Sequence, residues 1–303
     1  MKTAYDLLIL CEKLIMIPPK DEKLIRKYVK MAATDLKGWI NYEEEKIKRE
    51  KFDNDRFSTS LKPGSPISTY SLLLQLEETF KDTKNPQIIF EYKGVAGVAQ
   101  NKIITGAAQN LKQALDGAFV ESIVVVIAPN IYYGLFSQKK LLMDTFTQSL
   151  YNALSHEWTH TLQYRNIPDK YKFRAGGRSP LARKGIHIPD PAYYKRTDNE
   201  PGYDMPPQRT PYDKYISRPI ELMAWAQGIA AQLDAAGGER NETARREGVG
   251  RTIEGLAETI NNLHYGTPAY KLFMRHFIDA SLHRNIPREY LEYVITTARK
   301  SIP

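Results

Sequence analysis

The chain has 303 residues, enough to bury a large core in one big domain or two modest ones. A hydrophobic fraction of 42% and a charged fraction of 26% are typical of a globular protein, and no apolar run is long enough to predict membrane insertion. The single cysteine, Cys11, excludes an internal disulfide and a cysteine-rich metal site, and indicates a reducing compartment.

The net charge of +8 is dispersed along the chain, without blocks of like charge. We interpret it as a basic surface, and we do not expect a nucleic-acid partner. The apolar start, Met1 to Met16, is interrupted by Asp6 and Glu12, and no small-residue cleavage site follows. This pattern predicts an amphipathic helix with no signal peptide, and hence a cytoplasmic location.

Residues 1–66 form the first predicted region, which is helical. Two helices are expected between Thr3 and about Asp55, broken at Pro18-Pro19, and the second starts near Asp21. A polar loop with a Pro-Gly turn is expected from Ser58 to Pro66.

Residues 67–165 form the second predicted region, a small sheet followed by a long helix. A short helix is expected over Tyr70–Phe80. The strand candidates are Gln87–Tyr92, Lys102–Thr105 and Glu121–Pro129, with a helix candidate over Asn110–Gly117. Apolar residues at helical spacing then predict one amphipathic helix from about Lys139 to Tyr164.

Residues 166–218 form a third region, rich in proline, tyrosine and basic side chains and without periodicity. We interpret it as an insertion that covers the surface or a cleft, or docks on a protein partner; a variable loop without a role is an equal alternative. Residues 219–303 are predicted to be a helical lobe, with helices over Pro219–Leu233, Gly250–Tyr265, Pro268–Leu282 and Pro287–Lys300. The predicted fold class is α+β, mostly helical.

The pentapeptide His156-Glu157-Trp158-Thr159-His160 lies within the long predicted helix. Residues four apart lie on one face of a helix, so both imidazoles can reach one Zn²⁺. Glu157 is one step round the helix, where it can take a proton from a water that the metal activates. The alternative is a buried helix with two satisfied histidines and a surface glutamate.

A catalytic zinc site usually has three protein ligands, so a third residue is needed. Glu221, at the start of a helix that continues to Ala224 and Ala226, is our candidate, since a small residue one turn later lets two helices approach closely. Acidic residues also favour the first turn of any helix, so the motif is weak alone. His187 and His264 are the alternatives.

The motif H-E-x-x-H at His156–His160, followed by E-x-x-A-x-A at Glu221–Ala226, resembles gluzincin-type metallopeptidases, in particular zincin-like proteins of bacteria and bacteriophages. The resemblance covers about one fifth of the chain. It implies a zincin-like core and a Zn²⁺ ion bound by His156, His160 and Glu221. The interval between the motifs is longer than in thermolysin-like enzymes, and the 166–218 insertion accounts for it.

The predicted activity is hydrolysis of a peptide or protein substrate, with Glu157 as general base. Tyr215 is the candidate donor to the developing oxyanion, with Tyr212 and His264 as alternatives. A second hypothesis is a zincin scaffold used for binding or assembly, for example as a virion component of a phage. A third is nucleic-acid binding through the basic segment, with a structural metal.

Overall fold

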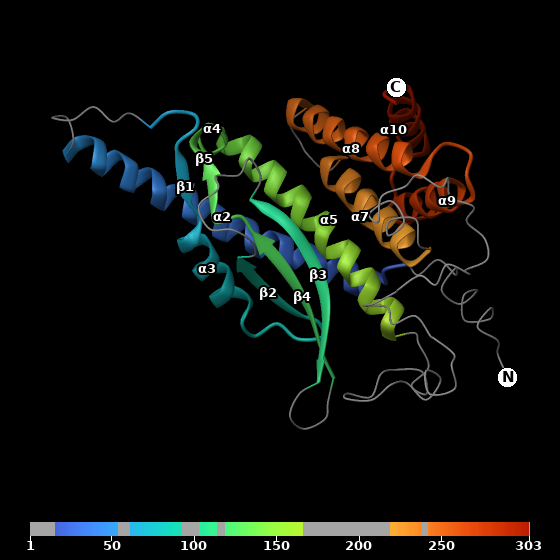
Figure 1. Ribbon diagram of the computed structural model, residues 1–303, viewed down its shortest axis with the longest axis horizontal. Helices are drawn as coiled ribbons and strands as arrows, with labels where there is room; N and C mark the ends of the chain where they lie inside the picture. Colours follow the sequence, from blue (N-terminus) through green and yellow to red (C-terminus); the bar gives the residue numbers. More distant parts are fainter. Residues whose placement is uncertain are drawn as a thin grey trace.

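The computed structural model describes residues 16–53, 61–92, 103–113, 119–165, 219–237 and 242–302. Most of these residues lie in helices, and the strands form two small sheets (Figure 1). The predicted α+β, mostly helical class is therefore confirmed. The predicted helix before Pro18 and the 166–218 insertion lie outside the described residues.

The first described helix is α2 (Pro19–Asp53), close to the predicted start at Asp21. Proline at the first helical position and acidic residues in the first turn favour a helix start here. The α2 helix packs on α3 (Tyr70–Phe80), which has its predicted bounds. Side chains from both helices are fully or almost fully buried in their shared core, among them Ile25, Leu36, Trp39, Leu72, Leu76 and Phe80.

The larger sheet has the order β2-β4-β3, so that β3 is an edge strand among the described residues. β2 (Gln87–Tyr92) is parallel to the central strand β4 (Phe119–Ile127), and β3 (Ile104–Gln113) is antiparallel to it. A second sheet pairs β1 (Pro66–Ser68) with β5 (Asn130–Tyr132). The sequence pattern did not predict these two short strands.

The helix predicted over Asn110–Gly117 is wrong where it can be compared. Residues 110–113 continue β3 and pair with residues 119–122 of β4, whereas residues 114–118 are not described. A shorter β3 would leave the backbone groups of residues 119–122 without their partners on that side. Pairing in the folded protein therefore overrides the local helix preference.

The long helix α5 (Lys139–Arg165) follows the short helix α4 (Tyr133–Phe136) and lies between the sheet and the C-terminal helices (Figure 1). It confirms the helix predicted over 139–164. Its last residue, Arg165, forms an ion pair with Glu121 at 2.6 Å and donates a hydrogen bond to the Asn85 carbonyl at 3.0 Å. These contacts fix the C-terminal end of α5 against the sheet.

The C-terminal helices are α7 (Pro219–Gly237), α8 (Glu242–Leu263), α9 (Pro268–His283) and α10 (Arg288–Lys300). All four were predicted, although α8 begins eight residues earlier than expected. They form a second hydrophobic core, whereas α2, α3, the sheet and α5 share the first. None of the described helices is long and apolar enough to cross a membrane.

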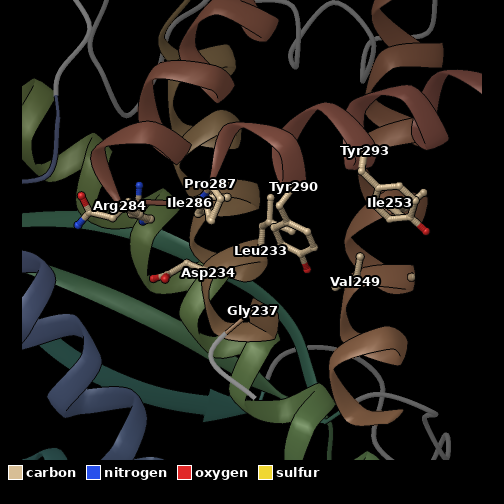
Figure 2. Close-up of a pocket in the computed structure, with 12 residues that line it drawn as sticks. Leu233, Asp234, Gly237, Val249, Ile253, Arg284, Ile286, Pro287, Tyr290 and Tyr293 are labelled. Carbon is tan, nitrogen blue, oxygen red and sulfur yellow. The ribbon is translucent and has the colours of Figure 1, made fainter. Parts of the chain in front are cut away.

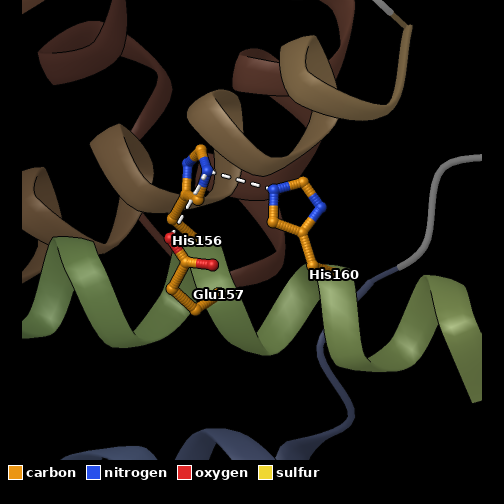
Figure 3. Close-up of side chains that lie close together, drawn as sticks. All are labelled: His156, Glu157 and His160. Carbon is orange, nitrogen blue, oxygen red and sulfur yellow. Dashed lines mark hydrogen bonds and ion pairs between the residues drawn. The ribbon is translucent and has the colours of Figure 1, made fainter. Parts of the chain in front are cut away.

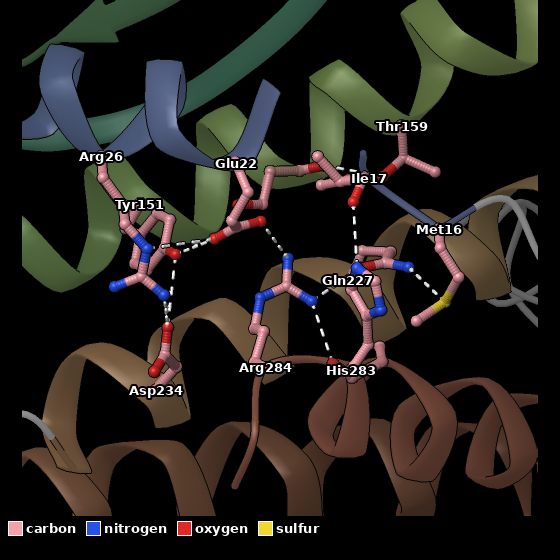
Figure 4. Close-up of polar contacts among 12 residues, drawn as sticks. Met16, Ile17, Glu22, Arg26, Tyr151, Thr159, Gln227, Asp234, His283 and Arg284 are labelled. Carbon is pink, nitrogen blue, oxygen red and sulfur yellow. Dashed lines mark hydrogen bonds and ion pairs between the residues drawn. The ribbon is translucent and has the colours of Figure 1, made fainter. Parts of the chain in front are cut away.

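The two cores meet where α5 lies against α7. Gly228 allows this approach, because a Cβ there would lie 3.1 Å from the Asn152 carbonyl oxygen on α5. The start of α2 is linked to the same region (Figure 4): Arg284 donates to Glu22 at 3.1 Å and to Gln227 at 2.7 Å. Tyr151 of α5 donates to Glu22 as well. The three chain segments are thus joined by buried polar contacts.

Candidate metal centre

His156 and His160 project from α5 toward the C-terminal helices, and Glu157 lies beside them on the same helix (Figure 3). All three are buried, with exposed fractions of 8%, 7% and 6%. Their potential ligand atoms lie within 4.8 Å of one another, so this group could hold a metal ion. It is the one group of its kind in the part of the chain that the structure describes.

Glu221, in the first turn of α7, lies against the two histidines and is 4% exposed. Its Oε2 atom is 3.4 Å from His160 Nε2 and 3.7 Å from His156 Nε2, and the two Nε2 atoms are 3.1 Å apart. Three potential ligand atoms from two helices therefore form a nearly equilateral triangle. The structure thus places Glu221 next to both H-E-x-x-H histidines, and its role as the third ligand stays a prediction.

The electrostatics of the three α5 residues follow from burial and from their proximity. Burial, together with the charge of His160, lowers the pKa of His156 to about 3. Burial also acts to lower the pKa of His160, but the Glu221 carboxylate outweighs it and raises that pKa to about 9. Burial raises the pKa of Glu157, and Glu221 adds to this effect. In the metal-free protein, a proton on His160 is thus balanced by the carboxylate of Glu221.

Four contacts around the site were not predicted from the sequence. Gln163 Oε1 lies 2.8 Å from His160 Nδ1, and Gln163 Nε2 lies 3.6 Å from the sulfur of Met223. The Gln109 backbone N–H donates to Glu157 Oε2 at 2.7 Å. The Trp225 ring packs edge-on against His156, with centroids 4.9 Å apart.

Two of these residues could have been found from the sequence. Gln163 follows His160 by three residues and Trp225 follows Glu221 by four, so each lies on the same helix face as a candidate ligand. The contact of Gln109 with Glu157 depends on the pairing of β3 with β4, and no local pattern in the sequence predicts that pairing.

Among the other candidate residues, the structure describes His264 alone, and it is not part of this cluster. His264 is exposed in the turn between α8 and α9, with φ of 56°. His187, Tyr212 and Tyr215 lie outside the described residues, so the role predicted for Tyr215 stays a prediction.

A cavity of about 810 Å³ lies elsewhere, between α7, α8, α10 and the α9–α10 connection (Figure 2). Its walls are mostly apolar, with Asp234 and Arg284 together at one end. None of His156, His160 and Glu221 is among the residues that line it.

Comparison of the chain with protein-family models, with curated proteins and with solved structures found no match.

Proposed function

We propose that the protein is a zinc-dependent metallopeptidase of the zincin type, with His156, His160 and Glu221 as ligands and Glu157 as general base. The observation that carries the proposal is the triangle formed by the two Nε2 atoms and Glu221 Oε2. A tetrahedral zinc ion with bonds of about 2.0–2.1 Å keeps its ligand atoms roughly 3.3 Å apart. The separations of 3.1, 3.4 and 3.7 Å lie on both sides of this value.

The donor set also suits zinc. Two imidazoles and one carboxylate are the ligands of one common kind of catalytic zinc site, in which a fourth position is open for water or substrate. When bound, the metal supplies Lewis acidity, which activates a water molecule and polarises the carbonyl of the scissile bond.

Glu157 is arranged to act on that water rather than to bind the metal. Its Oε2 atom accepts the hydrogen bond from the Gln109 backbone N–H, and its Oε1 atom is 3.9 Å from His156 Nε2. One carboxylate oxygen is therefore held by β3, and the other faces the histidines. From this position Glu157 would accept the proton of the attacking water and deliver it to the leaving amine.

The neighbouring strand supports a peptide as the substrate. β3 is an edge strand of the described sheet, and the Gln109 N–H points away from β4 toward Glu157. Backbone groups of alternate residues in an antiparallel strand point the same way, so those of Ala107 and Leu111 share this outer edge. An extended peptide could pair with that edge and bring its scissile bond next to Glu157.

The test is metal content and turnover in the wild type and in Glu157→Gln. We expect one zinc per chain in both proteins, and hydrolysis of casein about 10²–10⁴-fold slower in the variant, because the general base is lost while the ligands remain. Wild type without stoichiometric zinc, or a variant as active as wild type, would refute the proposal. Bound zinc with no hydrolysis of casein or of diverse peptides by either protein would favour a scaffold used for binding or assembly.

A further inference from the structure

Gln163 is buried where the C-terminal end of α5 packs against the start of α7, the helix that carries Glu221. It lies one turn beyond His160 on α5, is 5% exposed, and contacts His160 through Oε1 and Met223 of α7 through Nε2. Met223 is fully buried and lies two residues after Glu221. A single amide thus contacts one candidate ligand directly and the helix of another.

In the neutral imidazole that a metal would bind, the orientation of this amide determines which nitrogen of His160 carries the proton. The oxygen of a glutamine side chain only accepts hydrogen bonds and its nitrogen only donates. A thioether sulfur is a weak acceptor, so the amide nitrogen belongs on the side of Met223. The oxygen then faces His160, whose Nδ1 must donate to it over 2.8 Å.

The position of that proton matters for metal binding. A histidine with its proton on Nδ1 can offer the lone pair of Nε2 to a metal, and His160 Nε2 is the atom that faces His156 and Glu221. The opposite amide orientation would direct an N–H at Nδ1 and favour a proton on Nε2, where it would block the ligand atom. Outer partners of this kind commonly change metal affinity by about 10–100-fold.

We infer that Gln163 is the positioning residue of the metal centre, which fixes the tautomer of His160 and links α5 to the Glu221 helix through Met223. The inference rests on the zinc site proposed above. Gln163 contacts His160 at Nδ1, whereas Nε2 of the same ring faces His156 and Glu221, so Gln163 acts through His160.

The experiment compares Gln163→Leu with Gln163→Glu. Leucine has a similar volume but accepts no hydrogen bond, whereas glutamate keeps an acceptor for the His160 Nδ1 proton. We expect Gln163→Leu to bind zinc about 10–100-fold more weakly than wild type in competition with a chromophoric chelator. Gln163→Glu should restore most of the affinity, which a purely space-filling role would not predict.

Gln148→Leu is the matched control. Gln148 is buried on the same helix at 2% exposure and accepts hydrogen bonds from Arg251, away from the histidines. Its replacement should lower the stability of the fold and leave the zinc affinity unchanged. Equal affinity losses in the two leucine variants would overturn the inference, and so would a Gln163→Leu protein that binds zinc as tightly as wild type.

A spectroscopic measurement separates this inference from the proposed function. In ¹H–¹⁵N correlation spectra, the His160 Nδ1 proton should be present and slow to exchange with water in metal-free and zinc-loaded wild type, and fast to exchange in Gln163→Leu. An unprotonated Nδ1 in wild type would refute the role of Gln163. If wild type failed to bind zinc but kept the slow Nδ1 proton, the zinc proposal would fail and the Gln163–His160 contact would stand.

Discussion

Replacement of Gly228 by alanine tests the contact that brings Glu221 to the histidines. Gly228 follows Glu221 by seven residues, two helical turns, and so lies on the same face of α7. A Cβ at this position would clash with Asn152 Oδ1 and lie 3.1 Å from the Asn152 carbonyl oxygen. The side chain of Asn152 is also held, because its Nδ2 donates to Gln232 Oε1 at 2.8 Å.

The expected loss of stability combines two opposing effects. Inserting a methyl group into a well-packed contact costs about 1–3 kcal/mol. Alanine is better than glycine within a helix by about 1 kcal/mol. We therefore expect Gly228→Ala to lower the free energy of unfolding by up to about 2 kcal/mol. It should also weaken zinc binding, because the added methyl group displaces α7 from α5 and Glu221 moves with it.

Gly255→Ala on α8 is the control, since a Cβ there meets nothing within 4 Å. It should raise the free energy of unfolding by up to about 1 kcal/mol through helix propensity alone. Urea unfolding of both variants, with zinc affinity measured in parallel, makes the comparison. Adding Asn152→Ala to Gly228→Ala should recover part of the loss. A Gly228→Ala protein stabilised as much as Gly255→Ala would refute the close approach of the two helices.

Three other perturbations have defined outcomes. Glu221→Gln should weaken zinc binding by more than the roughly 10–100-fold typical of outer-shell partners, and chelator competition measures this; unchanged affinity would remove Glu221 from the ligand set. Arg284→Met should cost about 1.5–3 kcal/mol in urea unfolding, because Glu22 loses its buried charged partner and keeps its contacts with Tyr151 and Arg26, whereas Arg26→Met, at a half-exposed position, should cost about 1 kcal/mol or less; equal losses would contradict a larger contribution from the buried pair. His276→Leu should flatten the loss of stability between pH 6.5 and 4. Burial and Arg275 lower the pKa of His276 to about 4, so between pH 6.5 and 4 the unfolded chain binds one more proton than the folded chain. The free energy of unfolding therefore falls by about 1.4 kcal/mol for each pH unit by which the pH is lowered. An unchanged pH profile would show that His276 is not held neutral.

The helices could be predicted from the sequence because their apolar residues recur with the period of one buried face. The helix Tyr70–Phe80 and the strand Gln87–Tyr92 have the predicted bounds for this reason. Residues 110–113 were wrongly predicted as helix because that segment follows neither the helical nor the strand period. Its conformation is set by pairing with β4.

The candidate site could likewise be predicted only in part. His156, Glu157 and His160 belong to one helical turn, so their local spacing predicts that they lie together. The proximity of Glu221 depends on the packing of α7 against α5, which spacing alone could not settle. The contact of Gln109 with Glu157 depends on the register of β3, and no side-chain pattern encodes the direction of a backbone N–H.

The contacts at the start of α2 bear on when the site forms during synthesis. Glu22 pairs with Arg284, and the Ile17 carbonyl lies 3.2 Å from His283 Nε2, so each contact joins residues more than 250 positions apart. Contacts between such distant residues can form only after the intervening chain has been made. The Ile17 and Glu22 contacts can therefore form only after residues 283 and 284 have been made. The contact of α5 with α7, which brings the candidate ligands together, needs no residue beyond Gly237, so the candidate metal centre can form before the start of α2 is fixed beside it.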